Sequence, residues 1–423
     1  MPIRLAVYED AGWRSLLPLV YVRAVFQLIC GANDLLSRIR RLTVEADSFR
    51  GHPDPDLWCR SETGEIVEEE TNLRVNAPLD GATLLLNGRG VWTALPELSE
   101  ENSSWVGTAD SQMACIFAAA DLAQGLSSNA LLLESGEVPK GLQNLPRRDV
   151  SHCVDLIRWP WELVSANGVS LEEDWRVCSS KGVIDGGVDE GAHILGGDSV
   201  TIGSGSRIMP GAVIDAETGP VWIGSNVKVM PHAYIKGPTW IGDGCQLNPG
   251  VVIREDTTIG PFSRVGGEIV ASIVHGHANK QHYGFLGNSY ICPWANLAAG
   301  CTNSNVKNTY GRVRVPINGE EVDTGELFVG TFVGDHSKAG INLAIPTGTI
   351  VGFCCSVFAP KSPRFVRSFS WVDGNRIEGY DEERGLAVAK KVMERRGLAM
   401  SPVMERGFLA VRQIAEEIES RSD

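Results

Sequence analysis

The stretch 223–265, IGSNVKVMPHAYIKGPTWIGDGCQLNPGVVIREDTTIGPFSRV, decides the fold because an aliphatic residue recurs at every sixth position. The recurring positions are Ile223, Val229, Ile235, Ile241, Leu247, Ile253, Ile259 and Val265. A six-residue period matches neither the alternation of a strand nor the 3.6-residue repeat of a helix. It predicts a solenoid in which each hexapeptide supplies one short strand and one turn. Three hexapeptides then close a triangular coil of about 18 residues, whose aliphatic side chains stack inside.

The same period continues on both sides of this stretch. Further registers run through Ile202, Ile208 and Ile214, through Phe285, Ile291 and Leu297, and through Leu327, Val333, Ala339, Ile345, Val351 and Val357. The sequence therefore predicts a β-helix over 180–360. The period breaks at about 272–283 and again at about 303–326. We expect both breaks to be loops that leave the solenoid, where functional residues concentrate.

The length of 423 residues exceeds what one ordinary core accommodates, so several domains are expected. The N-terminal part mixes strand-like and helix-like patterns, which predicts an α/β domain over 1–150. A linker with a helix follows at 151–179, then the β-helix at 180–360 and a C-terminal helical tail at 361–423.

Individual elements are predicted from periodicity and turn residues. Strands are expected at Ile3–Tyr8, Ala82–Asn87 and Ala130–Glu134. Helices are expected at Ala32–Leu42, Asp110–Leu122, Pro160–Asn167 and, with an interruption near 397–402, at Glu383–Glu419. The acidic segment 45–75 has few aliphatic residues and is predicted to be a long surface excursion.

The charge balance limits the partners of the chain. A net charge of −14 argues against nucleic acid, because binding a phosphate backbone needs a basic face. No apolar run is long enough to span a membrane, and the start Met1-Pro2-Ile3-Arg4 lacks the apolar stretch of a signal peptide. The ten cysteines include no Cys-x-x-Cys pair and are expected to be reduced thiols. These features predict a cytoplasmic protein that acts on small molecules.

Several motifs resemble one family. They are Val265-Gly266-Gly267-Glu268, Asn279-Lys280-Gln281-His282, Gly284-Phe285-Leu286-Gly287, Trp294-Ala295-Asn296-Leu297 and Gly334-Asp335-His336-Ser337-Lys338, with Pro160-Trp161-Glu162-Leu163, Asn167 and Asp174 upstream. Together they are similar to the alternate bacterial relatives of the bifunctional N-acetylglucosamine-1-phosphate uridyltransferase/glucosamine-1-phosphate acetyltransferase. The resemblance implies a left-handed β-helix with acyltransferase activity, assembled as a homotrimer. It also implies a sugar nucleotidyltransferase-like domain at the N-terminus.

Acyl transfer from a thioester to an amine needs a base that removes the amine proton near neutral pH, and histidine suits this role. His282 matches the position that resembles the family's catalytic base. Asn296 matches an asparagine that would hydrogen-bond the substrate or the oxygen of the transition state. The resemblance therefore implies that His282 and Asn296 are the catalytic pair.

The resemblance also assigns binding residues. Arg264, Lys280 and Phe285 would contact the sugar substrate, and Phe285 stands where the acetyltransferases carry tyrosine. Acetyl-CoA is the expected co-substrate. Its site, between two subunits of the trimer, would include Asn305, Lys307 and Lys338.

Near the N-terminus, Leu16-Leu17-Pro18-Leu19 with Arg23 and Asn87-Gly88-Arg89 resemble the nucleotidyltransferase-like domain of the same family. Arg14, Arg23 and Arg89 are candidate phosphate contacts, and Mg²⁺ is expected if this domain is active. The glycine-rich phosphate loop of ordinary nucleotidyltransferases is absent. The segment Tyr8–Arg14 stands in its place.

Three alternatives remain open from the sequence. The N-terminal domain could be the sole active one, a sugar-1-phosphate nucleotidyltransferase using UTP or dTTP, with the β-helix as a trimerisation scaffold. The pair His277 and His282 has the His-x₄-His spacing of γ-carbonic-anhydrase-like zinc enzymes, which share this fold. A non-catalytic binding scaffold is the third.

Overall fold

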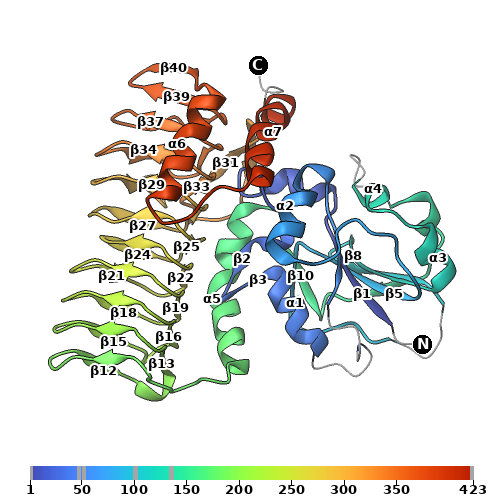
Figure 1. The fold of residues 1–423 in the computed structure, drawn as a ribbon, viewed down its shortest axis with the longest axis horizontal. Coiled ribbons are helices and arrows are strands. Elements are labelled where there is room, and N and C mark those ends of the chain that lie inside the picture. Colours follow the sequence, from blue (N-terminus) through green and yellow to red (C-terminus); the bar gives the residue numbers. More distant parts are fainter. Residues whose placement is uncertain (1–2, 45–48, 50–53, 99–102, 133–137, 420–423) are drawn as a thin grey trace.

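The computed structural model describes residues 3–44, 49, 54–98, 103–132 and 138–419. An N-terminal α/β domain lies beside a long parallel β-helix, and the helix α5 (Pro160–Val177) runs between them along the β-helix (Figure 1). Two C-terminal helices, α6 (Glu382–Glu394) and α7 (Pro402–Glu419), fold back over the last coils and reach the N-terminal domain.

The N-terminal domain is built on a six-stranded sheet with the order β4-β1-β5-β8-β7-β9. The strands are β1 (Arg4–Tyr8), β4 (Asp56–Trp58), β5 (Thr83–Asn87), β7 (Trp105–Ala109), β8 (Gln112–Ala118) and β9 (Arg147–Asp149). Two small pairs accompany it, β2 (Ile29–Cys30) with β3 (Asn33–Asp34) and β6 (Gly90–Trp92) with β10 (Val154–Leu156). The helices are α1 (Leu35–Val44), α2 (Ser61–Thr71), α3 (Ala120–Gly125) and α4 (Ser128–Leu131), with 3₁₀ turns at Ala11–Leu16, Val25–Gln27 and Lys140–Leu142.

The predicted strands that became β1 and β5 and the predicted helix that became α1 are confirmed. The helix predicted at Asp110–Leu122 is wrong, because β7 and β8 form an antiparallel hairpin there and only the short α3 follows. A short buried apolar run does not distinguish a strand from a helix by its pattern.

Two further predictions in this domain are wrong where the structure describes them. The predicted strand Ala130–Glu134 begins inside helix α4, and its last two residues lie outside the described part. The segment 45–75 is not one surface excursion, because it contains the sheet strand β4 and the helix α2. Residues 45–48 and 50–53 lie outside the described part.

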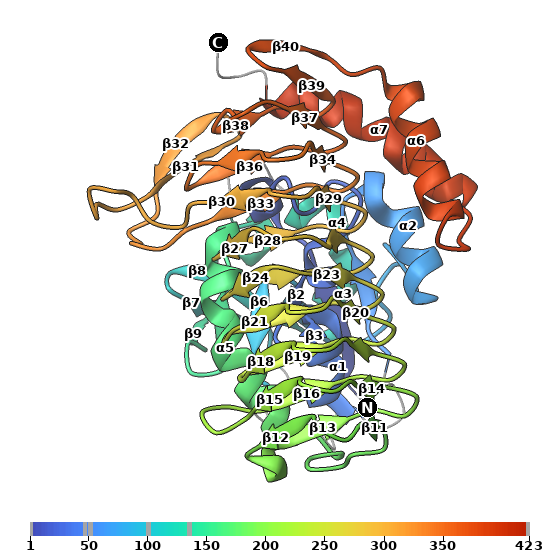
Figure 2. The same cartoon turned by 90° about the vertical axis from the view of Figure 1, so that its left-hand side faces the viewer.

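The β-helix is a left-handed prism with three parallel sheets. The first sheet, which faces α5 and the N-terminal domain, contains β13 (Val200–Ile202), β16 (Val221–Ile223), β19 (Thr239–Ile241), β22 (Thr257–Ile259), β25 (Ile273–Val274), β28 (Tyr290–Ile291), β33 (Thr331–Val333), β36 (Thr349–Val351) and β38 (Phe365–Val366). Successive coils stack as rungs along the prism (Figure 2).

The second sheet contains β11 (Gly187–Val188), β14 (Arg207–Ile208), β17 (Lys228–Val229), β20 (Gln246–Leu247), β23 (Arg264–Val265), β26 (Asn279–Lys280), β29 (Asn296–Leu297), β34 (Lys338–Ala339), β37 (Ser356–Phe358), β39 (Ser370–Asp373) and the antiparallel β40 (Arg376–Gly379). The third contains β12 (His193–Leu195), β15 (Val213–Asp215), β18 (Tyr234–Lys236), β21 (Val252–Ile253), β24 (Glu268–Val270) and β27 (Phe285–Gly287). A 3₁₀ turn at Gly197–Ser199 lies in the first coil.

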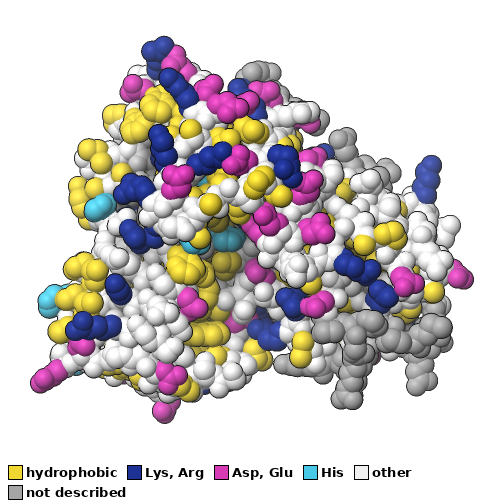
Figure 3. All heavy atoms as spheres, viewed as in Figure 1, with side chains coloured by type: hydrophobic (Ala, Val, Ile, Leu, Met, Phe, Trp, Pro, Cys, Tyr) yellow, Lys and Arg dark blue, Asp and Glu magenta, His cyan; other side chains and the backbone are white. Residues whose placement is uncertain are grey.

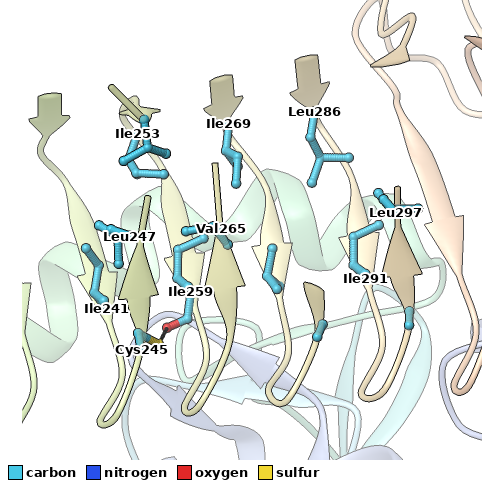
Figure 4. Close-up of a cluster of buried hydrophobic side chains, with 14 of the residues drawn as sticks. Ile241, Cys245, Leu247, Ile253, Ile259, Val265, Ile269, Leu286, Ile291 and Leu297 are labelled. Atoms are coloured by element: carbon cyan, nitrogen blue, oxygen red, sulfur yellow. Dashed lines mark hydrogen bonds between the residues drawn. The ribbon is translucent and has the colours of Figure 1, made fainter. Parts of the chain in front are cut away.

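The predicted inward stacking is confirmed. Ile223, Ile241, Ile259, Val274 and Ile291 pair in sequence along the first sheet. These side chains are at most 1% exposed. Figure 4 shows how the aliphatic side chains of all three sheets point into the same interior.

The first predicted loop, 272–283, is wrong because the chain stays in the solenoid there. Val274, Lys280 and Leu286 occupy successive inward positions, and β25 and β26 are regular rungs. The sequence pattern failed because a lysine replaces an aliphatic residue and one corner is shorter. Phe285 and Leu327 were also assigned inward positions, but Leu286 is the inward residue and Leu327 is 37% exposed.

The second predicted loop does leave the solenoid. After β30 (Thr302–Asn303) the chain forms an antiparallel hairpin of β31 (Arg314–Ile317) and β32 (Glu320–Asp323) before it returns at β33. The hairpin touches the N-terminal domain, where Asn318 Nδ2 donates to the carbonyl of Arg14 at 3.0 Å.

Helix α5 connects the two domains through buried polar contacts, and it is longer than the predicted Pro160–Asn167. Asn167 Oδ1 accepts from the backbone N–H of Gly31 at 2.8 Å and from the Thr258 hydroxyl at 3.1 Å. Asp174 binds Arg38 and Arg41 on the N-terminal side. Because these groups are buried and paired, they fix how the domains lie against each other.

Candidate functional site

A column of polar side chains points outward from the second sheet. Each two-residue strand turns its first residue outward and its second inward, so Arg264, Asn279, Asn296 and Lys338 lie above one another in register. They line a pocket of about 370 Å³, which we call the cationic pocket. Its other walls are Gln281, Trp294, Val392, Arg395 and Arg396, the last three from the end of α6.

The cationic pocket contains four cations and no carboxylate among its lining residues. Arg396 donates to Asn279 Oδ1 at 2.8 Å and to the carbonyl of Phe262 at 3.2 Å. Burial, and then repulsion by Arg264, lower the pKa of Arg396. Burial also lowers the pKa of Lys338, whose Nζ donates to the carbonyl of His336. Cations that repel one another without a neutralising group make a site for an anion.

His282 lies at the corner where the second and third sheets meet, on the exposed turn after β26. The preceding residue, Gln281, lines the cationic pocket, so His282 directly follows a residue of the pocket wall. The turn is held by backbone contacts: Asn248 Nδ2 donates to the carbonyl of Gln281, and Gly300 N–H donates to the carbonyl of Tyr283. The predicted base is therefore exposed on a fixed turn.

Lys280 requires a correction. Its side chain points into the prism and is 1% exposed, so it has no access to a substrate on the surface. Its Nζ donates to the carbonyls of Gly266 and His282. Burial lowers the pKa of Lys280 to about 8. Lys280 is therefore buried and joined to the His282 turn, and it cannot make the predicted substrate contact at the surface.

Phe285 and Asn305 lie on the outer side of the third sheet, around the corner from the cationic pocket. A Cβ added at Gly287 would be 2.6 Å from the Phe285 ring and 2.9 Å from Asn305 Nδ2, so the two side chains are neighbours over this glycine. Asn305 Nδ2 donates to Asn288 Oδ1 at 2.8 Å. Lys307 follows at the start of the excursion and binds the carbonyl of Arg312.

The predicted β-helix residues therefore form two groups. Arg264, Asn296 and Lys338 face the cationic pocket, whereas Phe285 and Asn305 face the other side of the corner that carries His282.

The N-terminal arginines are engaged in protein contacts. Arg23 forms a buried bidentate ion pair with Asp335 of the β-helix. Arg89 binds both carboxylate oxygens of Asp10, at 2.7 and 2.6 Å, and the carbonyl of Ile157. The Arg14 guanidinium lies 5.0 Å from the Trp13 ring centroid. Phosphate binding by these arginines stays a prediction, and the first two have structural partners already.

Metal ligands are not grouped within the described ranges. No cluster of three His, Cys, Asp or Glu that could hold a metal ion is found there. Asp10, at the carboxyl end of β1, has both oxygens bound by Arg89, so it offers Mg²⁺ no free ligand. His277 and His282 do not converge, since His277 stacks between Phe262 and Trp294 at a different corner of the prism. Among the helices of the described part, none is long and apolar enough to cross a membrane.

Sequence reasoning missed the C-terminal contribution to the site. Arg395 and Arg396 reach the cationic pocket only because α6 folds back over the second sheet. The adjacent Arg-Arg pair at the end of a predicted helix was the one available signal. Its destination depends on tertiary packing.

Comparisons with known proteins agree with this architecture. Residues 5–182 match the family described as sugar nucleotidyl transferase, and residues 220–255 match the bacterial transferase hexapeptide family. A bifunctional sugar-1-phosphate nucleotidylyltransferase/acetyltransferase of Sulfurisphaera tokodaii is 27% identical over 91 residues, 22% of this chain. The match spans 23% of that relative's length.

Two solved structures are also similar. The UDP-N-acetylglucosamine acyltransferase of Campylobacter jejuni is 11% identical, with a TM-score of 0.21 over 54% of this chain and 95% of that one. The Francisella novicida UDP-N-acetylglucosamine acyltransferase is 14% identical, with a TM-score of 0.24 over 57% and 75%. From the family matches and the fold, the chain joins a sugar nucleotidyltransferase-like domain to a β-helix of bacterial transferase hexapeptides.

Proposed function

We propose that the β-helix transfers an acyl group from acetyl-CoA to the amine of an amino sugar that carries a phosphate or a nucleotide. The observation that carries this proposal is the cationic pocket, with Asn296 in its wall and the His282 turn at its edge. A phosphate held by Arg264 and Lys338 would anchor a small sugar so that its amine reaches His282.

The reaction needs one base and one oxyanion donor. The amine attacks the thioester carbonyl, and His282 takes the amine proton. Asn296 Nδ2 donates to the substrate or to the oxygen that becomes negative. The C–S bond then breaks, the coenzyme leaves as a thiolate, and the proton from the imidazolium restores its thiol.

The acyl donor would lie on the other side of the corner. Phe285 would contact the sugar there, and Asn305 and Lys307 would contact acetyl-CoA. Lys338 lies in the cationic pocket, apart from Asn305 and Lys307, so we assign it to the acceptor phosphate in place of the predicted coenzyme contact. We propose a homotrimer, in which a second copy covers the exposed corner and brings both sets of residues around one substrate.

Thiol release from acetyl-CoA tests this function, with glucosamine 1-phosphate and a panel of nucleotide-linked amino sugars as acceptors. We expect His282→Ala to lower the rate by about 10²-fold or more, the usual contribution of a general base. His232→Ala is the matched control, because His232 is exposed at the same corner of the prism, three coils earlier. Equal rates for the two variants would remove His282 from catalysis.

The N-terminal domain supports a second candidate, sugar-1-phosphate nucleotidyl transfer with Mg²⁺, because residues 5–182 match that family. The ion pair of Asp10 and Arg89 occupies the carboxyl ends of β1 and β5, where α/β sheets hold nucleotides. Pyrophosphate release from UTP or dTTP with a sugar 1-phosphate tests this candidate.

A further inference from the structure

A second, larger cavity lies between the two domains. It has a volume of about 650 Å³, within the range of small-molecule sites. Three walls enclose it: corner residues of the β-helix, the α2 side of the N-terminal domain, and the C-terminal segment from Met393 to Phe408. We call it the interdomain cavity. Figure 3 shows hydrophobic and histidine side chains in this hollow, with Lys and Arg side chains gathered beside it.

The interdomain cavity is mainly apolar with a few polar groups, the composition expected of a site for an organic ligand. Its apolar walls include Phe262, Trp294, Phe353, Met400 and Met404. The three methionines at its C-terminal wall, including Met393, are side chains that adapt readily to a bound shape.

Polar groups converge from both domains. Glu70 accepts from Gln27 at 2.6 Å on the N-terminal wall, and burial raises the pKa of this carboxyl. His277 and His336 come from the β-helix wall, and His336 is 7% exposed. The Nδ1 atoms of both histidines are buried without a hydrogen-bond partner in the described residues. Unpaired buried nitrogens are costly, and these two lie inside the wall of the interdomain cavity.

The interdomain cavity and the cationic pocket are neighbours. Trp294 lines both, and the end of α6 separates them, with Met393 in the cavity and Arg395 and Arg396 in the pocket. From the corner of His282 the order is therefore Gln281, the four cations, Trp294 and the interdomain cavity. A nucleotide-linked sugar has the same order of parts: sugar, two phosphates, nucleoside.

We propose that the acceptor is a nucleoside-diphosphate-linked amino sugar, whose diphosphate binds in the cationic pocket and whose nucleoside enters the interdomain cavity past Trp294. This inference rests on the proposed acyl transfer and narrows its substrate class. A sugar 1-phosphate would occupy only the cationic pocket and would leave the interdomain cavity empty. The C-terminal tail becomes a binding element, because Arg395 and Arg396, directly after α6, supply two of the four phosphate-binding cations.

Calorimetric titration tests the binding mode without acyl transfer. The probes are inorganic pyrophosphate and the diphosphates of uridine, thymidine, cytidine, adenosine and guanosine, added to the full chain. We expect at least one nucleoside diphosphate to bind about tenfold or more tightly than pyrophosphate, since the nucleoside adds buried contacts. Equal affinities would overturn the proposal.

Two variants separate the cavities. Ala399→Trp places a bulky ring at the wall of the interdomain cavity. It should weaken the nucleoside diphosphate about tenfold and leave pyrophosphate unchanged. Arg396→Gln should weaken both ligands, whereas Arg406→Gln, which removes an exposed arginine of the same tail paired with Glu65, should weaken neither. If Ala399→Trp leaves nucleoside diphosphate binding intact, the nucleoside does not lie in the cavity.

The two proposals fail in different ways. If a nucleoside diphosphate binds as expected but no acceptor releases thiol, the acyl transfer is wrong and the binding site remains. If thiol release is as fast with glucosamine 1-phosphate as with any nucleotide-linked amino sugar, the acyl transfer holds and the nucleotide assignment is wrong. Palmitoyl-CoA is a further probe in the same calorimetric titration. If palmitoyl-CoA binds, Ala399→Trp weakens it, and no nucleoside diphosphate binds, then the cavity holds an apolar chain and the proposal is overturned.

Discussion

At the scale of single residues, Lys280 is the position where sequence and structure differ most usefully. The motif around it pointed to a surface cation, but pairing with Val265 across β23 and β26 turns its side chain into the prism. A lysine is tolerated there because its stem packs like an aliphatic chain and its Nζ finds two carbonyls. One of these carbonyls belongs to His282, so a buried charge holds the turn of the proposed base.

The buried Lys280 predicts a pH dependence of stability. Its pKa is about 8 in the folded chain against 10.5 for the unperturbed group. Between these values the unfolded chain binds the extra proton, so the contribution of Lys280 to stability rises as pH increases from about 8 to about 10.5. This rise amounts to about 3 kcal/mol. The buried cysteines, whose pKa values are raised by burial, contribute the opposite trend, so the Lys280 contribution is measured as the difference between the wild type and Lys280→Met. Urea denaturation at pH 7 to 10 measures it. In Lys280→Met the rise should disappear, and an unchanged slope would show that Lys280 is not the titrating group.

The same substitution has a functional readout. Because Lys280 acts through the carbonyl of His282, Lys280→Met should lower kcat of thiol release with little change in KM for the acceptor. A substrate-binding role would instead raise KM with kcat retained. Steady-state kinetics of thiol release decide between the two.

At the scale of elements, the hexapeptide period predicted the rungs because every inward position has the same surroundings in each coil. The loop predicted at 272–283 is wrong because one corner is shorter and a lysine faces inward. The six-residue register therefore shifts while the chain stays in the solenoid. In the N-terminal domain the β7–β8 hairpin was predicted as a helix, since the buried run 114–118 carries no decisive period. Arg395 and Arg396 were missed because no local pattern specifies where α6 docks.

Because the interior side chains stack closely, truncating one of them should lower the free energy of unfolding substantially. Ile259 is fully buried between Ile241 and Val274, and Ile259→Ala should lower the free energy of unfolding by about 2–5 kcal/mol. Ile341→Ala is the matched control, because Ile341 is 70% exposed on a turn of the same solenoid. Denaturant titration of both variants checks the difference. A small effect at Ile259 would mean that the coils relax around the missing methyl groups.

At the scale of the whole molecule, the two domains form one body around the interdomain cavity. Arg23 of the N-terminal domain and Asp335 of the β-helix pair in its wall, and both are buried. Tyr21 donates to Glu419 of α7 at 2.5 Å, so the C-terminal helix is joined to the N-terminal domain as well. The N-terminal domain is therefore joined to both the β-helix and the C-terminal helix through buried contacts.

The buried ion pair of Arg23 and Asp335 predicts that Arg23→Met lowers the free energy of unfolding by about 3–5 kcal/mol, because Asp335 is left buried without a partner. The double variant Arg23→Met/Asp335→Leu should recover most of that loss, since no unpaired charge remains. A double-mutant cycle by denaturant unfolding measures the coupling. Additive effects would contradict a direct buried pair.

We propose that this chain is an acyltransferase whose active site lies on the β-helix. Two products measured from the same wild-type preparation test this proposal: thiol from acetyl-CoA with amino sugar nucleotides, and pyrophosphate from UTP or dTTP with sugar 1-phosphates. We predict thiol release that depends on an amino sugar nucleotide and on His282. Pyrophosphate release with no thiol release from any acceptor would contradict the claim and would assign the activity to the N-terminal domain.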